Sequence, residues 1–337
     1  MKRTTITQVA KEAGVTIGTV SHVINGTAPI SAETTERVRR AIKALNYIPN
    51  ATAKSLRSKK NYTIGLMLPN LNNSFHSKVA SAFIDKAYIE GYSVQIHGYE
   101  YSLERERREL ERLERNNIGT VIIFNGYGDE REIKNFLQKG IPVILADRSS
   151  TIAQVPHIKF DNHKIMLDIV SALQKKGYQR IGFFSEPIQL TNLKERFQGY
   201  QEALKKCGLS FNPKDVFVRD DLCLDNLKNG YRYMRDILSI NEKKTLPDAW
   251  IASSDLLAIG MMRAMHECGY QIPADFGVVG FDNTEISGYV NPRLTTVEQN
   301  QILLGEKLME MVKQINCDKK SVENISLEQS LVIRESC

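Results

Sequence analysis

Side chains that can hydrogen-bond to nucleic acid are closely spaced near the start of this 337-residue chain. Residues 16–25 read Thr-Ile-Gly-Thr-Val-Ser-His-Val-Ile-Asn and supply hydroxyl, imidazole and amide groups within ten positions. At helical spacing, the apolar members of this segment share one face. The outward face then carries Ile17, Gly18, Ser21 and His22. A helix with such a face can contact base edges in the major groove of DNA.

Two short helices joined by a glycine turn must position these side chains. Thr5 can cap the first helix, with Gln8 completing a capping box. Gly14 allows a sharp turn with positive φ, and Thr16 can cap the second helix. This is the pattern of a helix-turn-helix unit, whose second helix enters the major groove. The spacing alone leaves open an ordinary helical hairpin inside a larger core.

The distribution of charge favours DNA binding. Residues 1–60 contain eleven Lys and Arg and three Glu, a net charge of +8, whereas the whole chain carries +6. Residues 61–337 therefore carry −2. A basic N-terminal segment joined to a weakly acidic remainder is the electrostatic footprint of a protein that binds the phosphate backbone.

A third helix and a short polar segment follow. Ser31 can cap a helix that runs to Leu45 and closes a three-helix core, and this unit ends near Pro49. Residues 50–60 could form two helical turns, but Leu56 is their only large apolar residue. So short a helix is marginal alone in water, so we expect it to fold against DNA or against the same segment of a second subunit.

From residue 62, short apolar runs alternate with amphipathic helices. Strands are predicted at 63–68, 93–97, 120–124, 142–146, 180–184, 249–252, 278–281 and 330–333. Five helices are predicted to end in Schellman motifs, at Gly91, Gly140, Gly177, Gly208 and Gly269. The fold class is therefore an all-α helix-turn-helix head followed by an α/β body of doubly wound parallel sheet, with ligands at the carboxyl ends of the strands.

The sequence argues against several other classes of protein. Met-Lys-Arg leads directly into a polar helix start, and no apolar run approaches the roughly 20 residues that span a bilayer, so we expect a cytoplasmic protein. The five cysteines lack C-x-x-C spacing, and the six histidines form no metal-ligand pattern. No dinucleotide loop, Walker A or G-x-S-x-G motif occurs. We therefore expect no metal, no cofactor and no enzymatic activity.

With these parts in order, the chain resembles the lactose-repressor/galactose-repressor family of transcription factors along essentially its whole length. The resemblance rests on Val-Ala-Lys-Glu-Ala-Gly-Val-Thr at 9–16, Leu-Asn-Tyr-Ile-Pro-Asn at 45–50, Arg-Phe-Gln-Gly-Tyr at 196–200, Ser-Asp-Leu-Leu-Ala-Ile-Gly at 254–260 and Val-Gly-Phe-Asp-Asn at 279–283. It implies a DNA-binding domain at 1–49, a hinge at 50–61 and an effector-binding and dimerisation domain at 62–337.

The resemblance also implies that the large domain has two similar subdomains, as in periplasmic sugar-binding proteins. The first covers about 62–160 and 291–320, and the second covers about 161–290 and 321–337. The chain would then cross between them near residues 160, 290 and 320. An effector would bind in the cleft between the two subdomains.

DNA contacts are assigned by the same resemblance. Paired hinge helices fold on the operator in this family, and the residue that matches Leu56 wedges into the minor groove; packing of Leu56 on the body is the alternative. Ala53 on the same segment is a further implied contact. Ile17, Gly18 and His22 occupy base-reading positions beside Ser21, but Gly18 has no side chain for reading bases, so the operator sequence stays open. The implied phosphate contacts are Thr5, Thr16, Thr19 and Asn25.

Effector contacts follow in the same way. Arg196 and Asp282 match the most regular contacts of the family, because a guanidinium and a carboxylate each satisfy paired sugar hydroxyls. Each could instead belong to a structural ion pair. Weaker matches are Phe75, Asn125, Asp147, Arg148 and Ser254. Ser254 stands where lactose-repressor-like members have Asn, so the ligand need not be theirs. Trp250 is expected in the core.

The implied function is repression of a carbohydrate-utilisation operon under the control of a small ligand. The ligand could be an inducer, or the protein could depend on a purine-type or protein corepressor. A sugar-binding protein of the transport type would share the body but not the basic head. The expected partners are pseudo-palindromic operator DNA, a sugar or sugar derivative, and a second copy of the chain. We expect a homodimer and not a tetramer, because the sequence stops at Cys337 with no heptad tail after the last predicted strand.

Overall fold

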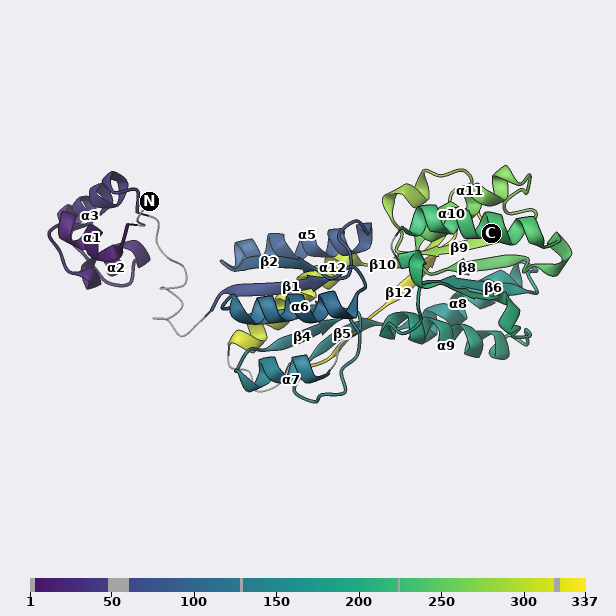
Figure 1. Cartoon of the computed structure of the whole chain (residues 1–337), viewed down its shortest axis with the longest axis horizontal. Helices are drawn as coiled ribbons and strands as arrows, with labels where there is room; N and C mark the ends of the chain where they lie inside the picture. The colour runs from purple at the N-terminus through teal and green to yellow at the C-terminus, as the bar shows by residue number, and fades with distance from the viewer. Residues whose placement is uncertain (1–3, 48–60, 128–129, 224, 318–321) are drawn as a thin grey trace. The chain divides into compact units, whose positions relative to one another are not determined.

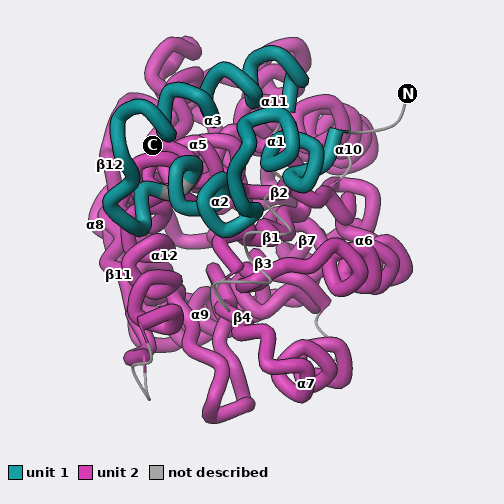
Figure 2. Tube along the Cα trace, turned by 90° about the vertical axis from the view of Figure 1, so that its left-hand side faces the viewer, with its two compact units in different colours: residues 1–60 teal, residues 61–337 magenta. Residues whose placement is uncertain are grey.

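The computed structural model describes residues 4–47, 61–127, 130–223, 225–317 and 322–337 (Figure 1). The chain divides into two compact units, residues 1–60 and residues 61–337 (Figure 2). The predicted hinge contacts Ala53 and Leu56 lie outside the described residues.

Three helices form the first unit, which we call the head: α1 (Ile6–Glu12), α2 (Ile17–Asn25) and α3 (Ala32–Ala44). Each helix follows a hydroxyl residue whose side chain accepts a hydrogen bond from the backbone N–H three positions later, at Thr5, Thr16 and Ser31. The Gln8 side chain accepts in return from the backbone N–H of Thr5 at 2.8 Å. The predicted capping box and the two other predicted caps are confirmed.

The head has its own small core. Gly14 turns the chain between α1 and α2 with φ of +64°, a backbone conformation that glycine adopts without a steric penalty. Val9, Val20 and Val38, one from each helix, are fully buried in one cluster. The helix-turn-helix pattern and the closing third helix are therefore both present.

The first lobe of the second unit is built on a parallel sheet with the strand order β11-β5-β4-β3-β1-β2. Its strands are β1 (Thr63–Leu68), β2 (Ser93–Gly98), β3 (Thr120–Phe124), β4 (Val143–Ala146), β5 (His157–Phe160) and β11 (Ile325–Leu327). Its helices are α5 (Ser74–Ile89), α6 (Leu103–Arg115), α7 (Glu130–Gln138) and α12 (Gln301–Asn316). One apolar cluster packs α5 and α12 on one face of the sheet, and a second cluster packs α6 and α7 on the other.

The second lobe repeats this plan with the order β12-β10-β9-β8-β6-β7, in which only β12 runs antiparallel to its neighbour. Its strands are β6 (Ile181–Ser185), β7 (Val216–Val218), β8 (Ala249–Ala252), β9 (Gly277–Phe281), β10 (Thr295–Gln299) and β12 (Gln329–Val332). Its helices are α8 (Asn162–Lys175), α9 (Thr191–Lys206), α10 (Asn226–Ile240) and α11 (Asp255–Glu267), with short 3₁₀ turns at 213–215, 220–223, 243–245 and 285–288. The helices α10 and α11 cover one face, where Trp250 is buried as expected, and α8 and α9 cover the other.

Two of the three predicted crossings between the lobes need correction. The first falls after β5, near residue 160 as predicted. The second follows β10 at residue 299 and not near 290, because β10 pairs with β9 and β12 in the second sheet. The third lies at residue 328 and not near 320, because β11 pairs with β5 in the first sheet. Both errors arise because neither strand has a clear apolar run: β10 is mostly polar, and β11 has only three residues.

The predicted helix ends are confirmed. After α5, Gly91 has φ of +76° and the N–H of Tyr92 donates to the carbonyl of Ala87 at 2.8 Å, which is the Schellman pattern. The other predicted glycines also have positive φ: Gly140, Gly177, Gly208 and Gly269. Within the described ranges, no helix is both long and apolar enough to cross a membrane.

Candidate functional site

A cleft lies between the two lobes at the carboxyl ends of their central strands, where ligands bind in doubly wound sheets. About 430 Å³ of space lies within it, a figure that includes its opening to solvent. From the first lobe it is lined by Asn73, Phe75, His76, Tyr101, Asn125 and Asp147. From the second lobe it is lined by Glu186, Leu190, Asn192, Leu193, Arg196, Ser253, Ser254, Asp282 and Gln299.

The backbone is strained where three strands reach the cleft. Asn125 follows β3 with φ of +49°, Asp147 follows β4 with φ of +53°, and Asp282 follows β9 with φ of +101°. A non-glycine residue in this region costs on the order of 1–3 kcal/mol, and such strain gathers at binding and switch sites. The three side chains are therefore held in place at a cost to stability.

Arg196 on α9 is the central cation of the cleft. Its side chain is only 3% exposed, and Nε donates to Asn162 Oδ1 at 3.1 Å, Nη1 to the Ser253 carbonyl at 3.0 Å and Nη2 to Gln299 Oε1 at 3.2 Å. The guanidinium carbon lies 3.9 Å from the centre of the Phe281 ring. A buried charge requires hydrogen-bond partners of this kind. The planar, forked guanidinium donates in fixed directions, and these bonds fix the orientation of the side chain.

The Gln299 amide connects Arg196 to Asp282. Its Oε1 accepts from Arg196 Nη2 and, at 3.1 Å, from Gln329 Nε2. Its Nε2 donates to Asp282 Oδ1 at 2.7 Å. The amide is buried, and it therefore holds the predicted cation and the predicted carboxylate in one hydrogen-bonded unit.

This unit touches all three crossings between the lobes. Asn162 begins α8 after the first crossing, Gln299 ends β10 at the second, and Gln329 begins β12 at the third. Arg196 bonds directly to the first two, and Gln299 bonds to the third. Arg196 and Gln299 together therefore make side-chain hydrogen bonds at each of the three crossings.

Asp147 makes a direct contact across the cleft. Its Oδ2 accepts from Asn192 Nδ2, on α9 of the second lobe, at 2.8 Å. The side-chain amide of Asn125 lies 2.8 Å from the Asp147 carbonyl oxygen. Oδ1 of Asp147 is buried and has no hydrogen-bond partner among the described residues. A ligand with a suitably placed donor would satisfy this oxygen.

Glu186 and Ser254 are held within the second lobe. Glu186 accepts hydrogen bonds from the hydroxyl of Ser253 and from the amide of Asn226. The Ser254 hydroxyl caps α11 by accepting from the Leu257 N–H at 3.3 Å, and it also accepts from Asn226 Nδ2 at 3.4 Å. Ser254 thus has a structural role in addition to its place in the lining.

Burial dominates the titration of the cleft. It raises the pKa of Asp282 to about 8, an effect that the charge of Asp255 increases and the charge of Arg196 opposes. Burial likewise raises the pKa of Asp147 to about 6, against the influence of Arg196. It lowers the pKa of His76 to about 4, so this imidazole is neutral at pH 7. The cleft therefore resists both additional negative charge and protonation of its histidine.

Six of the seven predicted effector residues meet in this cleft: Phe75, Asn125, Asp147, Arg196, Ser254 and Asp282. Arg148 does not line it. Its Nη1 donates to the Asn125 carbonyl at 2.9 Å, so the guanidinium holds the backbone of the loop that follows β3. Glu186, Asn192 and Gln299 are lining residues that the sequence did not single out. Glu186 directly follows β6, so the strand-end position itself was a usable signal.

The residues of the head that are predicted to contact DNA differ in their surroundings. Gly18 and His22 are exposed, and His22 Nδ1 lies 2.9 Å from the Thr27 hydroxyl. The hydroxyls of Thr16 and Thr19 lie 3.0 Å apart. Ile17, predicted to face outward, is half-buried against the head core, because so small a core gains from every apolar side chain that covers it. Ser21 is half-buried and Asn25 ends α2.

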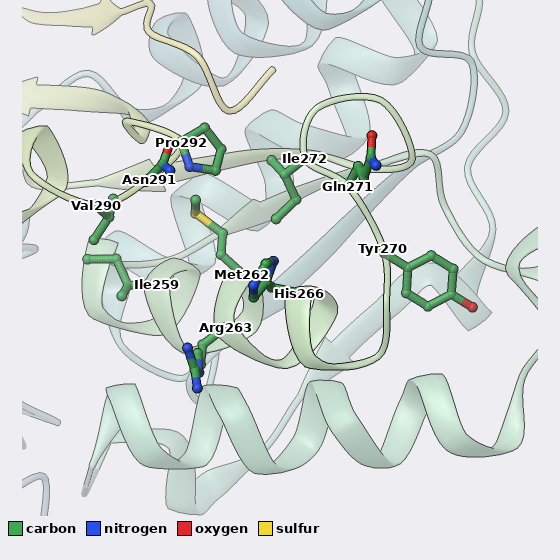
Figure 3. Close-up of a pocket in the computed structure, with 10 residues that line it drawn as sticks. All are labelled: Ile259, Met262, Arg263, His266, Tyr270, Gln271, Ile272, Val290, Asn291 and Pro292. Carbon is green, nitrogen blue, oxygen red and sulfur yellow. The ribbon is translucent and has the colours of Figure 1, made fainter.

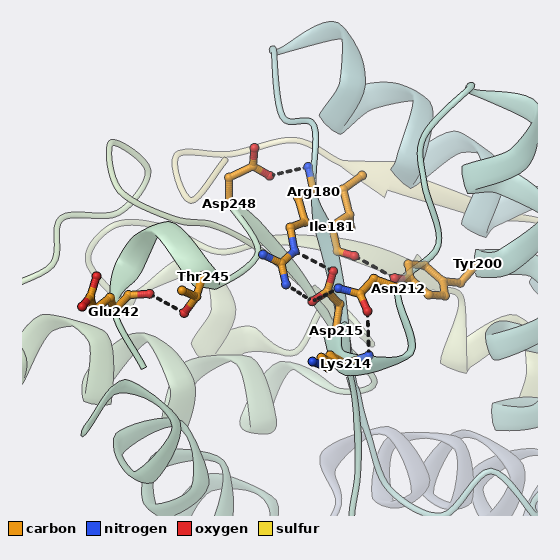
Figure 4. Close-up of polar contacts among 9 residues, drawn as sticks. All are labelled: Arg180, Ile181, Tyr200, Asn212, Lys214, Asp215, Glu242, Thr245 and Asp248. Carbon is orange, nitrogen blue, oxygen red and sulfur yellow. Dashed lines mark hydrogen bonds and ion pairs between the residues drawn. The ribbon is translucent and has the colours of Figure 1, made fainter. Parts of the chain in front are cut away.

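Two other features of the second lobe help to define the site by contrast. A larger hollow of about 1200 Å³, open to solvent, lies beside α11 and is lined by apolar side chains with Arg263 and His266 but no carboxylate (Figure 3). At the amino ends of β6 and β8, Asp248 accepts from the N–H of Arg180, whose guanidinium pairs with Asp215 at 2.6 Å (Figure 4). The charged groups of this second cluster pair with one another, whereas Asp147 Oδ1 in the cleft has no partner among the described residues.

Comparison with known proteins covers both units. Residues 5–50 match the family described as bacterial regulatory proteins, lacI family, and residues 170–337 match a periplasmic binding protein-like domain. The chain is 29% identical to catabolite control protein A of Priestia megaterium over 98% of both chains. It is 31% identical to the ribose operon repressor of Halalkalibacterium halodurans, over 99% of this chain and 97% of that one. The lac repressor dimer bound to operator and the anti-inducer ONPF superposes with a TM-score of 0.85 at 28% identity, over 99% of both chains.

Proposed function

Because the chain belongs to the lacI family of bacterial regulatory proteins, we propose that it represses a carbohydrate-utilisation operon under the control of a small ligand bound between its lobes. As a member of this family it is a DNA-binding transcriptional regulator. A relative that represses the ribose operon supports the carbohydrate assignment. Its operator DNA would place it in the cytoplasm.

The observation that carries the proposal is the bonding of Arg196 and Gln299 to all three crossings. Ligand hydroxyls that bond to Arg196 and Asp282 would change the hydrogen bonds at the three segments that connect the lobes. A ligand can shift a protein between two arrangements only by its difference in affinity for them. The cleft therefore supplies both a ligand site and a connection to lobe movement.

The DNA-binding form would be a homodimer on a pseudo-palindromic operator. The structurally similar lac repressor is a dimer on its operator. Large apolar side chains are exposed on both lobes of this chain, with Tyr88 and Ile89 in the first lobe 82% and 75% exposed and Tyr289 in the second 79% exposed. A partner subunit would cover such groups. The head would read bases with His22, and Leu56 would form the minor-groove wedge.

The test begins with operators selected by the full-length protein from random double-stranded DNA. Affinity for the selected site should fall by roughly 10³ to 10⁵ between 50 and 200 mM salt, because about 6 to 10 phosphate contacts release counterions. Sugars should then be screened for their effect on this affinity. Failure to select any sequence, or an affinity that does not change with salt, would contradict the proposal.

The direction of the ligand effect separates the two modes of control. Release of the operator by a sugar identifies an inducer. If no sugar releases it, purines are screened in the same assay, and a purine that tightens binding identifies a corepressor. Both outcomes require that Arg196→Ala and Asp282→Ala abolish the response. Operator binding without ligand should persist in both variants, because these residues lie in the second unit and the reading helix lies in the first.

A further inference from the structure

Negative side chains outnumber positive ones in the lining of the cleft. Asp147, Glu186 and Asp282 are the carboxylates, and Arg196 is the only Lys or Arg side chain among the described residues that line it. Two undescribed segments follow the lining closely in sequence, residues 128–129 and residue 224, and these are Gly, Asp and Leu. They therefore add no cation.

Arg196 already compensates this negative charge. Three of its N–H groups bond to the protein, and its charge opposes the raised pKa of both Asp147 and Asp282. An anionic ligand would compete with these two carboxylates for a single guanidinium. Pairing the anion would leave buried carboxylates uncompensated, which is strongly unfavourable.

Two carboxyl oxygens in the lining remain free to accept hydrogen bonds. Asp147 Oδ1 is buried without a partner in the described part of the chain. Asp282 holds Gln299 through Oδ1, and no described residue donates to its Oδ2. A hydroxyl or ammonium group can donate to these oxygens, whereas an ionised phosphate or carboxylate can only accept.

Two other cations, Arg148 beside the lining residue Asp147 and Lys159 at the first crossing, make contacts of their own. Arg148 donates to the carbonyl of Asn125 and lies beside Glu106. Lys159 pairs with Glu195 at 3.1 Å at the first crossing. Recruiting either to an anion in the cleft would break an existing contact.

On the premise of the proposed function, we propose that the cleft binds a polyhydroxylated ligand without a negative charge and excludes sugar phosphates and sugar acids. Transfer of an anion from water into a buried site is costly unless a cation pairs with it. Burial, with the charges of Asp255 and Glu186, raises the pKa of Asp282 to about 8 against the influence of Arg196. Asp282 is therefore largely protonated at pH 7, and Asp147, whose pKa is about 6, is the aspartate whose charge opposes an anion at this pH.

A panel of matched compounds tests this specificity on the full-length protein. Pentoses, hexoses and disaccharides are each supplied as the neutral sugar, a phosphate ester and the corresponding sugar acid, and binding is measured by thermal shift and calorimetry. We expect at least one neutral sugar to bind and its anionic derivatives to bind at least 100-fold more weakly.

Two outcomes would overturn the inference. A phosphate ester or acid that binds more tightly than its neutral parent contradicts the charge argument. A panel in which no compound binds contradicts the ligand class. Operator binding of the same preparation is measured in parallel, so that either result can be separated from failure of the repressor proposal.

Charge variants sharpen the test. Asp147→Asn removes one negative charge and one acceptor, so the affinity for the neutral ligand should fall about tenfold. The ratio of the affinities for the neutral sugar and its phosphate ester should also fall about tenfold. Asp168→Asn makes the same change on the exposed face of α8 and should alter neither value. Glu186→Gln replaces Asp147→Asn if that variant does not fold. A preference unchanged in the folded variant would show that the carboxylates do not set the specificity.

Discussion

The two lobes place an aspartate at the same point of the same sheet plan and hold it in different ways. Asp147 follows β4 and Asp282 follows β9, which are the corresponding strands of the two sheets. Both residues have positive φ, both are buried, and burial raises the pKa of both. Their hydrogen-bond donors, however, come from different places.

Asp282 is held by Gln299 of its own lobe, whereas Asp147 accepts from Asn192 of the opposite lobe in addition to Asn125 of its own. The second lobe therefore carries a preformed binding unit of Arg196, Gln299 and Asp282. The contact of Asp147 with Asn192 joins the two lobes, so it requires that they lie this close together. We infer that the ligand binds first to the second lobe and that the first lobe then closes over it.

The largest effect is expected from changing the buried arginine of the second lobe. Arg196→Lys keeps the charge but cannot replace three directed donors, so ligand affinity should fall more than 100-fold in calorimetry. The matched change in the first lobe, Arg148→Lys, removes only support for the Asn125 loop and should cost less than tenfold. Equal losses in the two variants would contradict the division of roles between the lobes.

The next effect concerns the dependence of stability on pH. A carboxyl group whose pKa is raised by folding stabilises the folded state below its unfolded pKa and loses that contribution as pH rises to its folded pKa. The free energy of unfolding should therefore fall between about pH 4 and 8 because of Asp282, and between about pH 4 and 6 because of Asp147. Linkage converts the rise of this pKa from 3.8 to about 8 into roughly 5 kcal/mol for Asp282 over that pH range.

Urea unfolding at pH 5, 6 and 8 checks this assignment. Asp282→Asn should flatten the change between pH 6 and 8, and Asp147→Asn should flatten only the change below pH 6. Asp255, whose pKa is also raised to about 6 by burial, remains in both variants. If Asp147→Asn removed the change in the free energy of unfolding above pH 6, Asp147 and not Asp282 would be the aspartate with the higher pKa.

Much of the fold was predictable because its signals are local. Hydroxyl caps such as Thr5, turn glycines such as Gly14 and continuous apolar strands such as β3 are read from a few neighbouring residues. The strands β5, β7, β10 and β11 were not predicted, because they have only three to five residues, and only β7 is an uninterrupted apolar run. Their pairing depends on long-range contacts, so the two later crossings were misplaced.

The site was predictable only in part for a related reason. Arg196 and Asp282 stand in recognisable motifs, and both line the cleft. Gln299 stands in no such motif, since its importance comes from meeting Gln329 and Arg196, 30 and 103 positions away. Arg148 was misassigned because an arginine next to a lining residue can point behind the site as readily as into it.

A smaller effect should follow from removing the connecting amide of the second lobe. Gln299→Met preserves length and burial but leaves Arg196 Nη2 and Asp282 Oδ1 without this partner. Ligand affinity should fall about tenfold, the loss of roughly one to two hydrogen bonds, and the effector should lose its influence on operator binding. Gln329→Met removes a single bond to Gln299, so it should weaken the ligand less than threefold. A normal operator response in Gln299→Met would rule out this amide as the connection to the crossings.

The smallest expected effect comes from the contact that joins the two lobes across the cleft. Asn192→Ala removes the donor to Asp147 Oδ2, so closure becomes less favourable and ligand affinity should fall about threefold. Lys159→Ala is the matched control, because the Lys159–Glu195 pair also joins the lobes but is partly exposed, and such pairs contribute about 0–1 kcal/mol. Its affinity should change less than twofold. Small-angle scattering with and without ligand measures closure directly, and the Asn192→Ala protein should need more ligand to reach the compact state. If it closes as readily as the unaltered chain, Asp147 does not depend on the opposite lobe, and the first lobe would have to bind the ligand with contacts of its own.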